Sequence, residues 1–284
     1  MLGKLLKYEF KATARLFLIL YLALIAVSAL NALLISLGGS TYGSFDNEVL
    51  VTVYSTITGL AIFLYVLIST AVVVATIIII IVRFYRMLGN EGYLWFTLPV
   101  TANQQILGKL IPALVWSFIS TIVFIISFGI LLMPMGITEM IQGIPEIWSS
   151  LIEMGLNPTL WTVCLLILLI VGGFEGYLMF YASMAIGPNI IKSRLGGTVL
   201  AYLILYVAMQ IVSTIQMVLL VIPLNNLATS IDNALMWGNI AGVMSAVDSI
   251  MVYSTVFYGI AYLVIGIVFY LLTRYFMSRK LNLA

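Results

Sequence analysis

The chain has 284 residues, of which 63% are hydrophobic and only 8% are charged, and its formal net charge at pH 7 is +2. Soluble domains carry about 25% charged residues, so this composition excludes an ordinary soluble protein and indicates a polytopic membrane protein. The chain has no histidine and a single cysteine, Cys164, which excludes histidine-based metal sites, Ser-His and Cys-His nucleophile pairs and any disulfide within the chain.

Residues 1–15, MLGKLLKYEFKATAR, are amphipathic. Their leucines can share one face of a helix, while Lys4, Lys7 and Lys11 share another. Such a helix can lie along the membrane surface with its lysines near anionic lipid headgroups. We expect this N-terminal interfacial helix; the alternative is a solvated start to the first span.

Apolar segments that are long enough to cross a bilayer follow, since about 20 apolar residues span its hydrocarbon core. The first of them is longer than the core of a signal peptide, so we expect it to be retained. The predicted fold is all-α, with six transmembrane helices in one transmembrane domain over residues 1–284. The predicted spans are about 16–37, 58–82, 105–133, 160–187, 197–222 and 249–273.

The charges in the loops predict the orientation of these spans. Every Lys and Arg of the chain lies before the first span, between spans 2 and 3, between spans 4 and 5, or after the last span. The other loops carry only acidic charges: Asp46, Glu48, Glu139, Glu146, Glu153, Asp232 and Asp248. By the positive-inside rule, both termini and both basic loops face the cytoplasm. An odd number of spans would put basic loops on both sides, so the pattern supports an even number.

Between the second and third spans, residues 88–110 read LGNEGYLWFTLPVTANQQILGKL and interrupt two long apolar runs. Gly89 can end the second span. Glu91 can lie at the positive N-terminal end of a short helix, and Leu98-Pro99 ends that helix because the residue before proline disfavours helical geometry. Thr101 to Gln104 then matches a capping box, which starts the next helix. The short helix is expected to expose its aromatic side chains as an interaction surface; the alternative is a turn whose aromatic side chains fold back onto the spans.

This stretch resembles the cytoplasmic loop of the permease subunits of type 2 ABC exporters. The matching elements are Glu91-Gly92, the segment Tyr93–Leu98, the turn Leu98-Pro99-Val100 and Gly108-Lys109, and the six-span layout agrees over the whole chain. The resemblance implies that the loop carries a short cytoplasmic coupling helix, which docks on a separate ATPase subunit. The docking residues that it implies are Glu91, Gly92, Tyr93, Leu94, Trp95 and Phe96.

The resemblance also implies a function and a location. It indicates a transport subunit, not an enzyme, in a bacterial cell membrane, which exports amphipathic cargo such as a lipid, a peptide antibiotic or a drug. The chain has no G-x-x-x-x-G-K-[ST] loop, so we expect ATP and Mg²⁺ to be bound by the partner ATPase and no cofactor or metal by this chain. The other expected partners are membrane lipid and a second copy or a sister permease, with no nucleic acid.

The loops that carry only acidic charges also contain apolar residues at helical spacing. In residues 134–158 this spacing predicts two short helices separated by Pro145, which form a surface brace or, alternatively, a lid. Residues 224–248 show a similar pattern, which is compatible with short re-entrant helices. Trp148, Trp161 and Trp237 are expected at the outer membrane interface.

Glu175 lies about 14 residues into the fourth span, near the bilayer midplane. A charged carboxylate at that depth costs about 2.5–3.5 kcal/mol, so Glu175 is expected to be protonated or to face a partner inside the bundle. Gln210 lies at a similar depth in the fifth span, and Ser213 and Thr214 share its face one turn further on. We therefore expect Glu175 to face this polar stripe.

Gly172 and Gly176 flank Glu175 at a spacing that would let two helices approach closely. The candidate intramembrane site therefore consists of Glu175, Gln210, Ser213 and Thr214, and it would take substrate or a proton. The alternative is a polar contact that only joins two helices. If no ATPase is involved, the same site would make the chain a stand-alone, proton-coupled secondary transporter.

Overall fold

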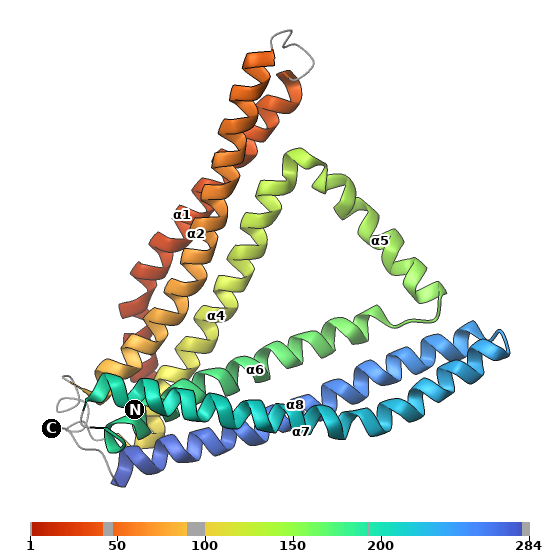
Figure 1. Ribbon diagram of the computed structural model, residues 1–284. Coiled ribbons are helices and arrows are strands. Elements are labelled where there is room, and N and C mark those ends of the chain that lie inside the picture. Colours follow the sequence, from red (N-terminus) through yellow and green to blue (C-terminus); the bar gives the residue numbers. More distant parts are fainter. Residues whose placement is uncertain (1, 42–47, 90–99, 192, 280–284) are drawn as a thin grey trace. The chain divides into compact units, whose positions relative to one another are not determined.

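The computed structural model describes residues 2–41, 48–89, 100–191 and 193–279, which are almost entirely helical and contain no β-strand (Figure 1). Within these residues, six helices are long and apolar enough to cross a membrane, which confirms the predicted all-α class and the predicted number of spans. The elements are α1 (Leu2–Thr41), α2 (Glu48–Leu88), α4 (Ala102–Leu132), η1 (Met133–Met135), α5 (Ile137–Glu153), α6 (Pro158–Ile186), η2 (Gly187–Asn189), α7 (Arg194–Met236) and α8 (Ile240–Arg279).

The helices are longer than the apolar spans inside them. The longest, α7, has 43 residues, and at 1.5 Å per residue it is roughly 65 Å long, against about 30 Å for the hydrocarbon core of a bilayer. Hydrophobicity indicates only the part of a helix that is apolar enough to lie in the hydrocarbon core. The backbone hydrogen bonds continue through the polar residues on either side, so the helical ends could not be found from the apolar runs.

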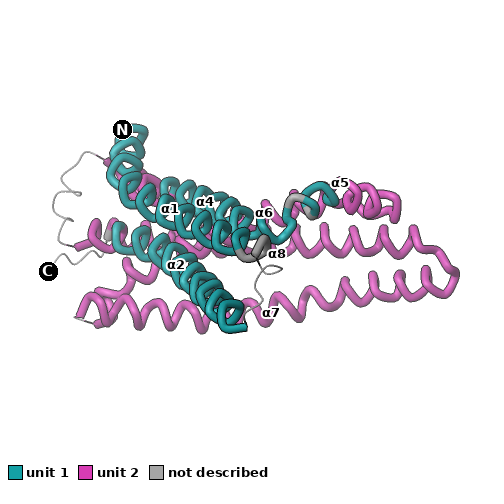
Figure 2. Tube along the Cα trace, turned by 90° about the horizontal axis from the view of Figure 1, so that it is seen from above, with its two compact units in different colours: residues 1–83, 111–144 teal, residues 84–110, 145–284 magenta. Residues whose placement is uncertain are grey.

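The described residues form two compact units (Figure 2). Unit 1 contains residues 1–83 and 111–144, and unit 2 contains residues 84–110 and 145–284. Unit 1 therefore holds α1, most of α2 and most of α4, and unit 2 holds α6, α7 and α8. This division does not test whether the chain works as a single permease domain, which stays a prediction.

Stacked aromatic side chains form part of the core of unit 1. Phe17 of α1 stacks on Trp116 of α4 with 4.5 Å between the ring centroids, and Tyr21 packs on both. The Trp116 indole nitrogen donates a hydrogen bond of 2.8 Å to the Thr13 hydroxyl, and the hydroxyls of Tyr21 and Ser120 lie 2.7 Å apart. Hydrogen bonds between transmembrane helices contribute only about 0.6 kcal/mol each on average, so these contacts mainly fix which residues face each other.

An ion pair joins α1 and α2 within unit 1. The guanidinium of Arg83 donates a hydrogen bond of 3.0 Å to the Glu9 carboxylate, and Glu9 is only 4% exposed. Buried carboxylates are tolerated in proteins when a positive group compensates them. Glu9 and Arg83 are 74 residues apart, and no sequence pattern pairs them.

Residues 2–15 are the first turns of α1 and do not form a separate helix. The side chains of Lys4, Lys7 and Lys11 are exposed, as their spacing predicted, while Phe10 packs on Trp116 with 6.1 Å between the ring centroids. The apolar side of this segment is therefore partly covered by protein. Its position at a membrane surface stays a prediction.

The segment at Pro145 and residues 224–248 differ from the prediction. Pro145 lies inside the single continuous helix α5, because a proline removes one backbone hydrogen bond and bends a helix without always ending it. In residues 224–248, α7 continues to Met236 and α8 begins at Ile240, so this segment holds a tight helical hairpin and no separate short helices.

Two consecutive residues build that hairpin. Gly238 has a φ of +65°, and the backbone N–H groups of Gly238 and Asn239 donate to the carbonyls of Leu235 and Ala234, which closes the end of α7. The Asn239 side chain then accepts a hydrogen bond of 3.0 Å from the Gly242 backbone N–H and caps the start of α8. A Gly-Asn pair between two apolar runs is a turn signal that the sequence analysis missed.

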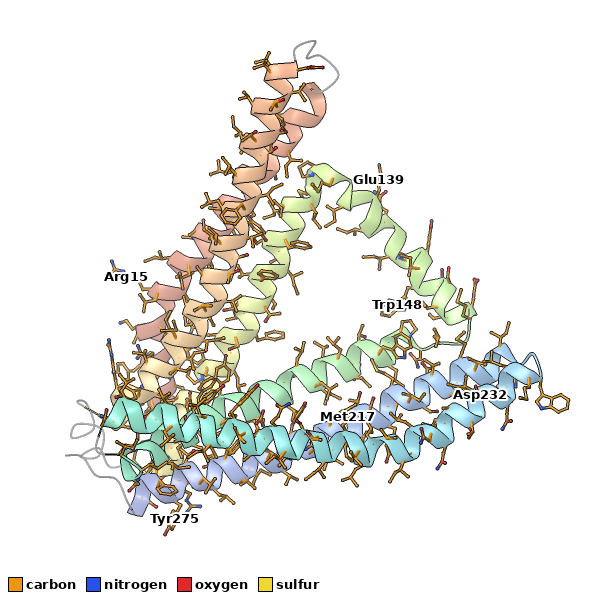
Figure 3. The ribbon with its side chains drawn as sticks, viewed as in Figure 1. Arg15, Glu139, Trp148, Met217, Asp232 and Tyr275 are labelled. Atoms are coloured by element: carbon orange, nitrogen blue, oxygen red, sulfur yellow. The ribbon has the colours of Figure 1, made fainter. Side chains whose placement is uncertain are left out.

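Charge distinguishes the two ends of unit 2. We call residues 145–160 and 224–250 its acidic end, because they contain Glu146, Glu153, Asp232 and Asp248 and no Lys or Arg. The opposite end of α6, α7 and α8 carries Arg194, Arg274 and Arg279, and we call it the basic end. Figure 3 places Asp232 and Tyr275 toward opposite ends of unit 2, with Met217 between them.

Replacing Arg83 by Gln is expected to destabilise unit 1, because it removes the positive charge beside the buried Glu9 carboxylate. Losing one partner of a fully buried pair costs about 3–5 kcal/mol, and since Arg83 is itself 29% exposed we expect a cost on the order of 2 kcal/mol. Thermal unfolding of the purified protein measures it. Arg15→Gln removes the same charge from an exposed position of α1 and is the control; equal melting temperatures for the two variants would contradict the prediction.

Candidate functional site

The six residues predicted to dock on an ATPase, Glu91, Gly92, Tyr93, Leu94, Trp95 and Phe96, lie outside the described residues. The chain is described on both sides of them. The second transmembrane helix ends at Leu88, and the next begins at Ala102. Both of these flanks belong to unit 2.

The flank that precedes the segment packs on α6 and α7. Phe84 stacks almost parallel on Tyr181 of α6, with 3.7 Å between the ring centroids, and both rings are fully buried. Arg194, the first residue of α7, donates a hydrogen bond of 3.0 Å to the Tyr85 carbonyl, and its guanidinium lies 4.7 Å from the centre of the Tyr85 ring. The last turn of α2 is therefore held by one residue of each of two other helices.

The flank that follows the segment begins with the predicted capping box. The Gln104 side chain accepts a hydrogen bond of 3.2 Å from the Thr101 backbone N–H, and the Thr101 hydroxyl accepts one of 3.4 Å from the Gln104 backbone N–H. This confirms the motif read from the sequence. The next turns of α4 are buried in unit 2, including Gln105 and Lys109, which are 1% and 6% exposed.

Glu175 lies on α6, where that helix packs along α8. Its Oε1 atom is shielded from solvent and has no hydrogen-bond partner among the described residues. The α8 backbone passes close by at Gly266: a Cβ built on Gly266 would lie 2.7 Å from the Phe174 ring and 3.6 Å from the Glu175 Cα. Gly266 therefore lets α8 approach the helix that carries Glu175.

One tyrosine of α8 lies near Glu175, and a second packs on it. Tyr262 precedes Gly266 by one helical turn and lies within electrostatic range of Glu175. The Tyr262 ring stacks on Tyr258, with 6.1 Å between the centroids. A carboxyl group with an enclosed oxygen near a phenol group can exchange a proton or accept a hydrogen bond from a polar group of a substrate. These tyrosines were not singled out in the sequence, since sixteen tyrosines are spread along the chain.

The polar stripe on α7 is not placed against Glu175 as predicted. Gln210, Ser213 and Thr214 are all exposed, and the hydroxyls of Ser213 and Thr214 donate to the Gln210 carbonyl at 2.9 and 2.8 Å. Helical spacing correctly placed the three on one face, but it carries no information about which helix that face meets. The buried polar residue of α7 is Gln216, which is 8% exposed.

The close helix contact predicted at Gly172 and Gly176 of α6 is also not found in the structure. A Cβ on Gly172 or Gly176 would meet no atom within 4 Å, so neither glycine permits a close approach between helices within unit 2. Gly266 does so instead, from the opposite helix. A single glycine in an apolar run gives no spacing pattern, which explains why it was missed.

No model of a known protein family matches the chain, and no match is found among curated proteins or solved structures. The resemblance to exporter permeases therefore depends on the motifs of residues 88–110 and on the layout of the spans. Function has to be argued from the geometry around these features.

Gly266→Ala is expected to destabilise the contact between α6 and α8, because its Cβ would lie 2.7 Å from the Phe174 ring. The matched control is Gly259→Ala on the same helix, where a Cβ meets no atom within 4 Å. There the better helix propensity of alanine should stabilise the protein by up to about 1 kcal/mol. Melting temperatures of both variants measure the difference.

The same contact predicts a rescue. Phe174→Ala removes the ring that the new Cβ would meet, so the Gly266→Ala defect should be smaller in a Phe174→Ala background than in the wild-type background. A Gly266→Ala variant as stable as Gly259→Ala would show that α6 and α8 do not approach at this point.

Proposed function

We propose that this chain is the membrane-spanning permease subunit of an ATP-driven ABC exporter. It moves an amphipathic substrate, such as a lipid, a peptide antibiotic or a drug, out of a bacterial cell with energy from a separate ATPase subunit. Two copies of the chain, or the chain and a sister permease, enclose the path. Residues 91–96 dock on the ATPase and transmit its movements to the spans.

The packing of the last turn of α2, which precedes residues 90–99, is the observation that carries this proposal. The turn before them is held by Tyr181 of α6 and Arg194 of α7. Tyr181 follows Glu175 by six residues on the same helix, which is roughly 9 Å along its axis. A partner that pulls on this segment would therefore act directly on α6 and α7, and so on the helix that carries the intramembrane carboxyl group.

The separation of charges supports the proposed orientation. The described Lys and Arg residues of unit 2 lie at its basic end or in the flanks of residues 90–99, and the acidic end has none. Under the positive-inside rule, this distribution supports a cytoplasmic position for the segment and both termini, where ATP is available.

A Glu91→Ala/Trp95→Ala double variant is expected to lose the ATPase. Truncating an aromatic residue at the centre of an interface costs about 2 kcal/mol or more, so capture should fall more than about tenfold. The measurement is a pull-down of tagged full-length protein from its native host in mild detergent, with bound proteins identified by mass.

The matched control is Glu146→Ala/Trp148→Ala, which removes the same two residue types from α5. It should retain the ATPase, because the proposed orientation puts these residues on the opposite side of the membrane. If wild-type protein captures no ATPase even after cross-linking, the exporter proposal fails.

A proton-coupled secondary transporter is the second candidate function. The specific observation in its favour is the enclosed Glu175 Oε1 atom, which has no hydrogen-bond partner among the described residues. A carboxyl group at this depth can carry a proton as neighbouring helices move. In that case the chain would work without an ATPase and would stop when the proton gradient is collapsed.

Glu175→Gln is expected to reduce transport more than about tenfold while the protein still assembles with its partners, because an amide keeps the shape but cannot exchange a proton or carry charge. Efflux of ethidium, rhodamine 6G and a fluorescent phospholipid from expressing cells measures transport. Gln210→Leu, at a similar depth but on an exposed position of α7, should change efflux less than about twofold. Normal efflux by Glu175→Gln would remove Glu175 from the site under both candidate functions.

A further inference from the structure

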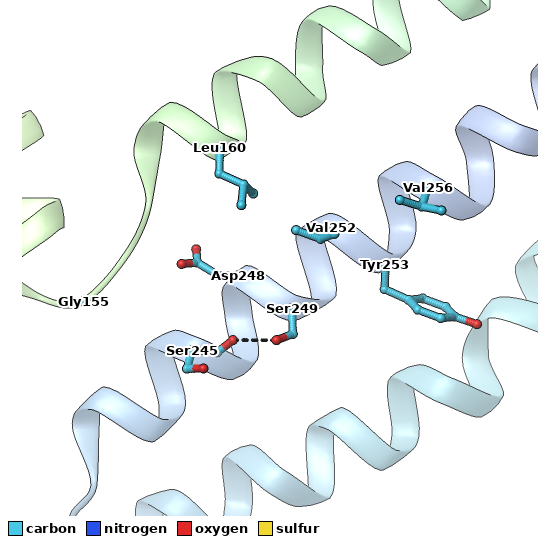
Figure 4. Close-up of a pocket in the computed structure, with 8 residues that line it drawn as sticks. All are labelled: Gly155, Leu160, Ser245, Asp248, Ser249, Val252, Tyr253 and Val256. Atoms are coloured by element: carbon cyan, nitrogen blue, oxygen red, sulfur yellow. Dashed lines mark hydrogen bonds between the residues drawn. The ribbon is translucent and has the colours of Figure 1, made fainter.

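An open cavity of about 590 Å³ lies at the acidic end of unit 2, away from Glu175 (Figure 4). The turn before α6, the first turns of α6 and one face of α8 line it. Cavities of about 300–1,000 Å³ are typical of sites for small organic ligands. The sequence analysis assigned no site to this region.

Most of the wall is apolar, and the charge is concentrated at one place. Leu160, Val252 and Val256 contribute aliphatic surface, and Tyr253 contributes an aromatic ring. Asp248 is the one charged residue among those lining the cavity, and Figure 4 shows its carboxylate directed from α8 toward the chain before Leu160. The cavity therefore combines an apolar wall with a single negative charge.

Two neutral donors from α6 and the turn before it hold the Asp248 carboxylate in place. The Trp161 indole nitrogen donates a hydrogen bond of 2.8 Å, and the Asn157 backbone N–H donates one of 3.1 Å. A carboxylate offers about four lone-pair positions, so these bonds leave acceptor capacity unused. They orient the group but do not neutralise its charge. An asparagine would keep one acceptor oxygen, enough for the bond from Trp161, without carrying a charge.

No positive charge compensates Asp248 at this end of unit 2. No Lys or Arg lines the cavity, and the first Arg that follows on α8 is Arg274, 26 residues further on, which is roughly 39 Å along the helix. The nearby chain contributes only acidic charges, namely Glu146, Glu153 and Asp232. The local field therefore attracts cations and repels anions.

We propose that this cavity is a binding site for hydrophobic monocations, such as organic ammonium or phosphonium compounds. The positive centre lies beside Asp248, and the apolar body lies against Leu160, Val252 and Val256. This proposal goes beyond the exporter function and does not rest on it, because it concerns equilibrium binding to the chain in the absence of any ATPase.

Equilibrium binding of tritiated tetraphenylphosphonium to the full-length protein in lipid nanodiscs tests the site, with protein-free nanodiscs as the blank. The competing ligand is tetraphenylborate, an anion of nearly the same size and shape. We expect saturable binding of the cation and at least about tenfold weaker binding of the anion. Binding no greater than the lipid blank, or equal binding of the two ions, would overturn the proposal.

Asp248→Asn keeps one of the two acceptor oxygens and removes the charge, so it should weaken binding of the cation at least about tenfold. Asp232→Asn removes the same charge from an exposed position of α7 that does not line the cavity, and should change binding less than about twofold. If both variants weaken cation binding equally, the cation is attracted only by the overall negative charge of this end of unit 2, and the proposed site is wrong.

Val252→Phe fills the cavity without changing any charge and should also weaken cation binding about tenfold. If Asp248→Asn does not fold, as judged by size-exclusion chromatography and melting temperature, Val252→Phe is the variant that tests the site. A folded Val252→Phe protein that binds tetraphenylphosphonium as the wild type does would overturn the proposal.

Discussion

The hydrocarbon core of a bilayer offers no hydrogen bonds to a peptide backbone, and every other property of this chain follows from that constraint. Each crossing segment must satisfy its own N–H and C=O groups, so the apolar stretches are helical. Lipid tails are as apolar as leucine side chains and provide no hydrophobic force between helices. The contacts that order the helices are therefore few and specific: stacked rings in unit 1, a close approach at Gly266 in unit 2, and single polar bonds.

Unit 2 brings together three features that are far apart in the sequence. The flanks of residues 90–99, the helix that carries Glu175 and the hairpin between α7 and α8 all belong to it. Phe84 and Tyr181 connect the first two, and Gly266 connects α6 to α8. A displacement of residues 90–99 can thus pass from one helix to the next through direct contacts, which suits a subunit driven by a partner outside the membrane.

Glu175 and Asp248, the two acidic residues of unit 2 for which we propose a role, differ in their surroundings. Glu175 faces packed helix in the middle of α6, with one oxygen that has no hydrogen-bond partner among the described residues. Asp248 lies at the acidic end, is oriented by Trp161 and Asn157, and borders an open cavity. The first group suits a proton that moves within the membrane, and the second suits a cation that arrives from the membrane surface. A chain that transports amphipathic compounds could use both, at different depths of the same unit.

The sequence by itself determined the all-α class, the number of membrane-length helices and the capping box at Thr101, because hydrophobic length and local hydrogen bonds depend only on neighbouring residues. It also placed Gln210, Ser213 and Thr214 on one face of one helix. Only the tertiary structure decided which faces meet: α6 packs along α8, so Glu175 lies beside Gly266, while the stripe on α7 is exposed. In lipid both faces of a helix are apolar, so the pattern that reveals the buried face of a soluble helix is missing here.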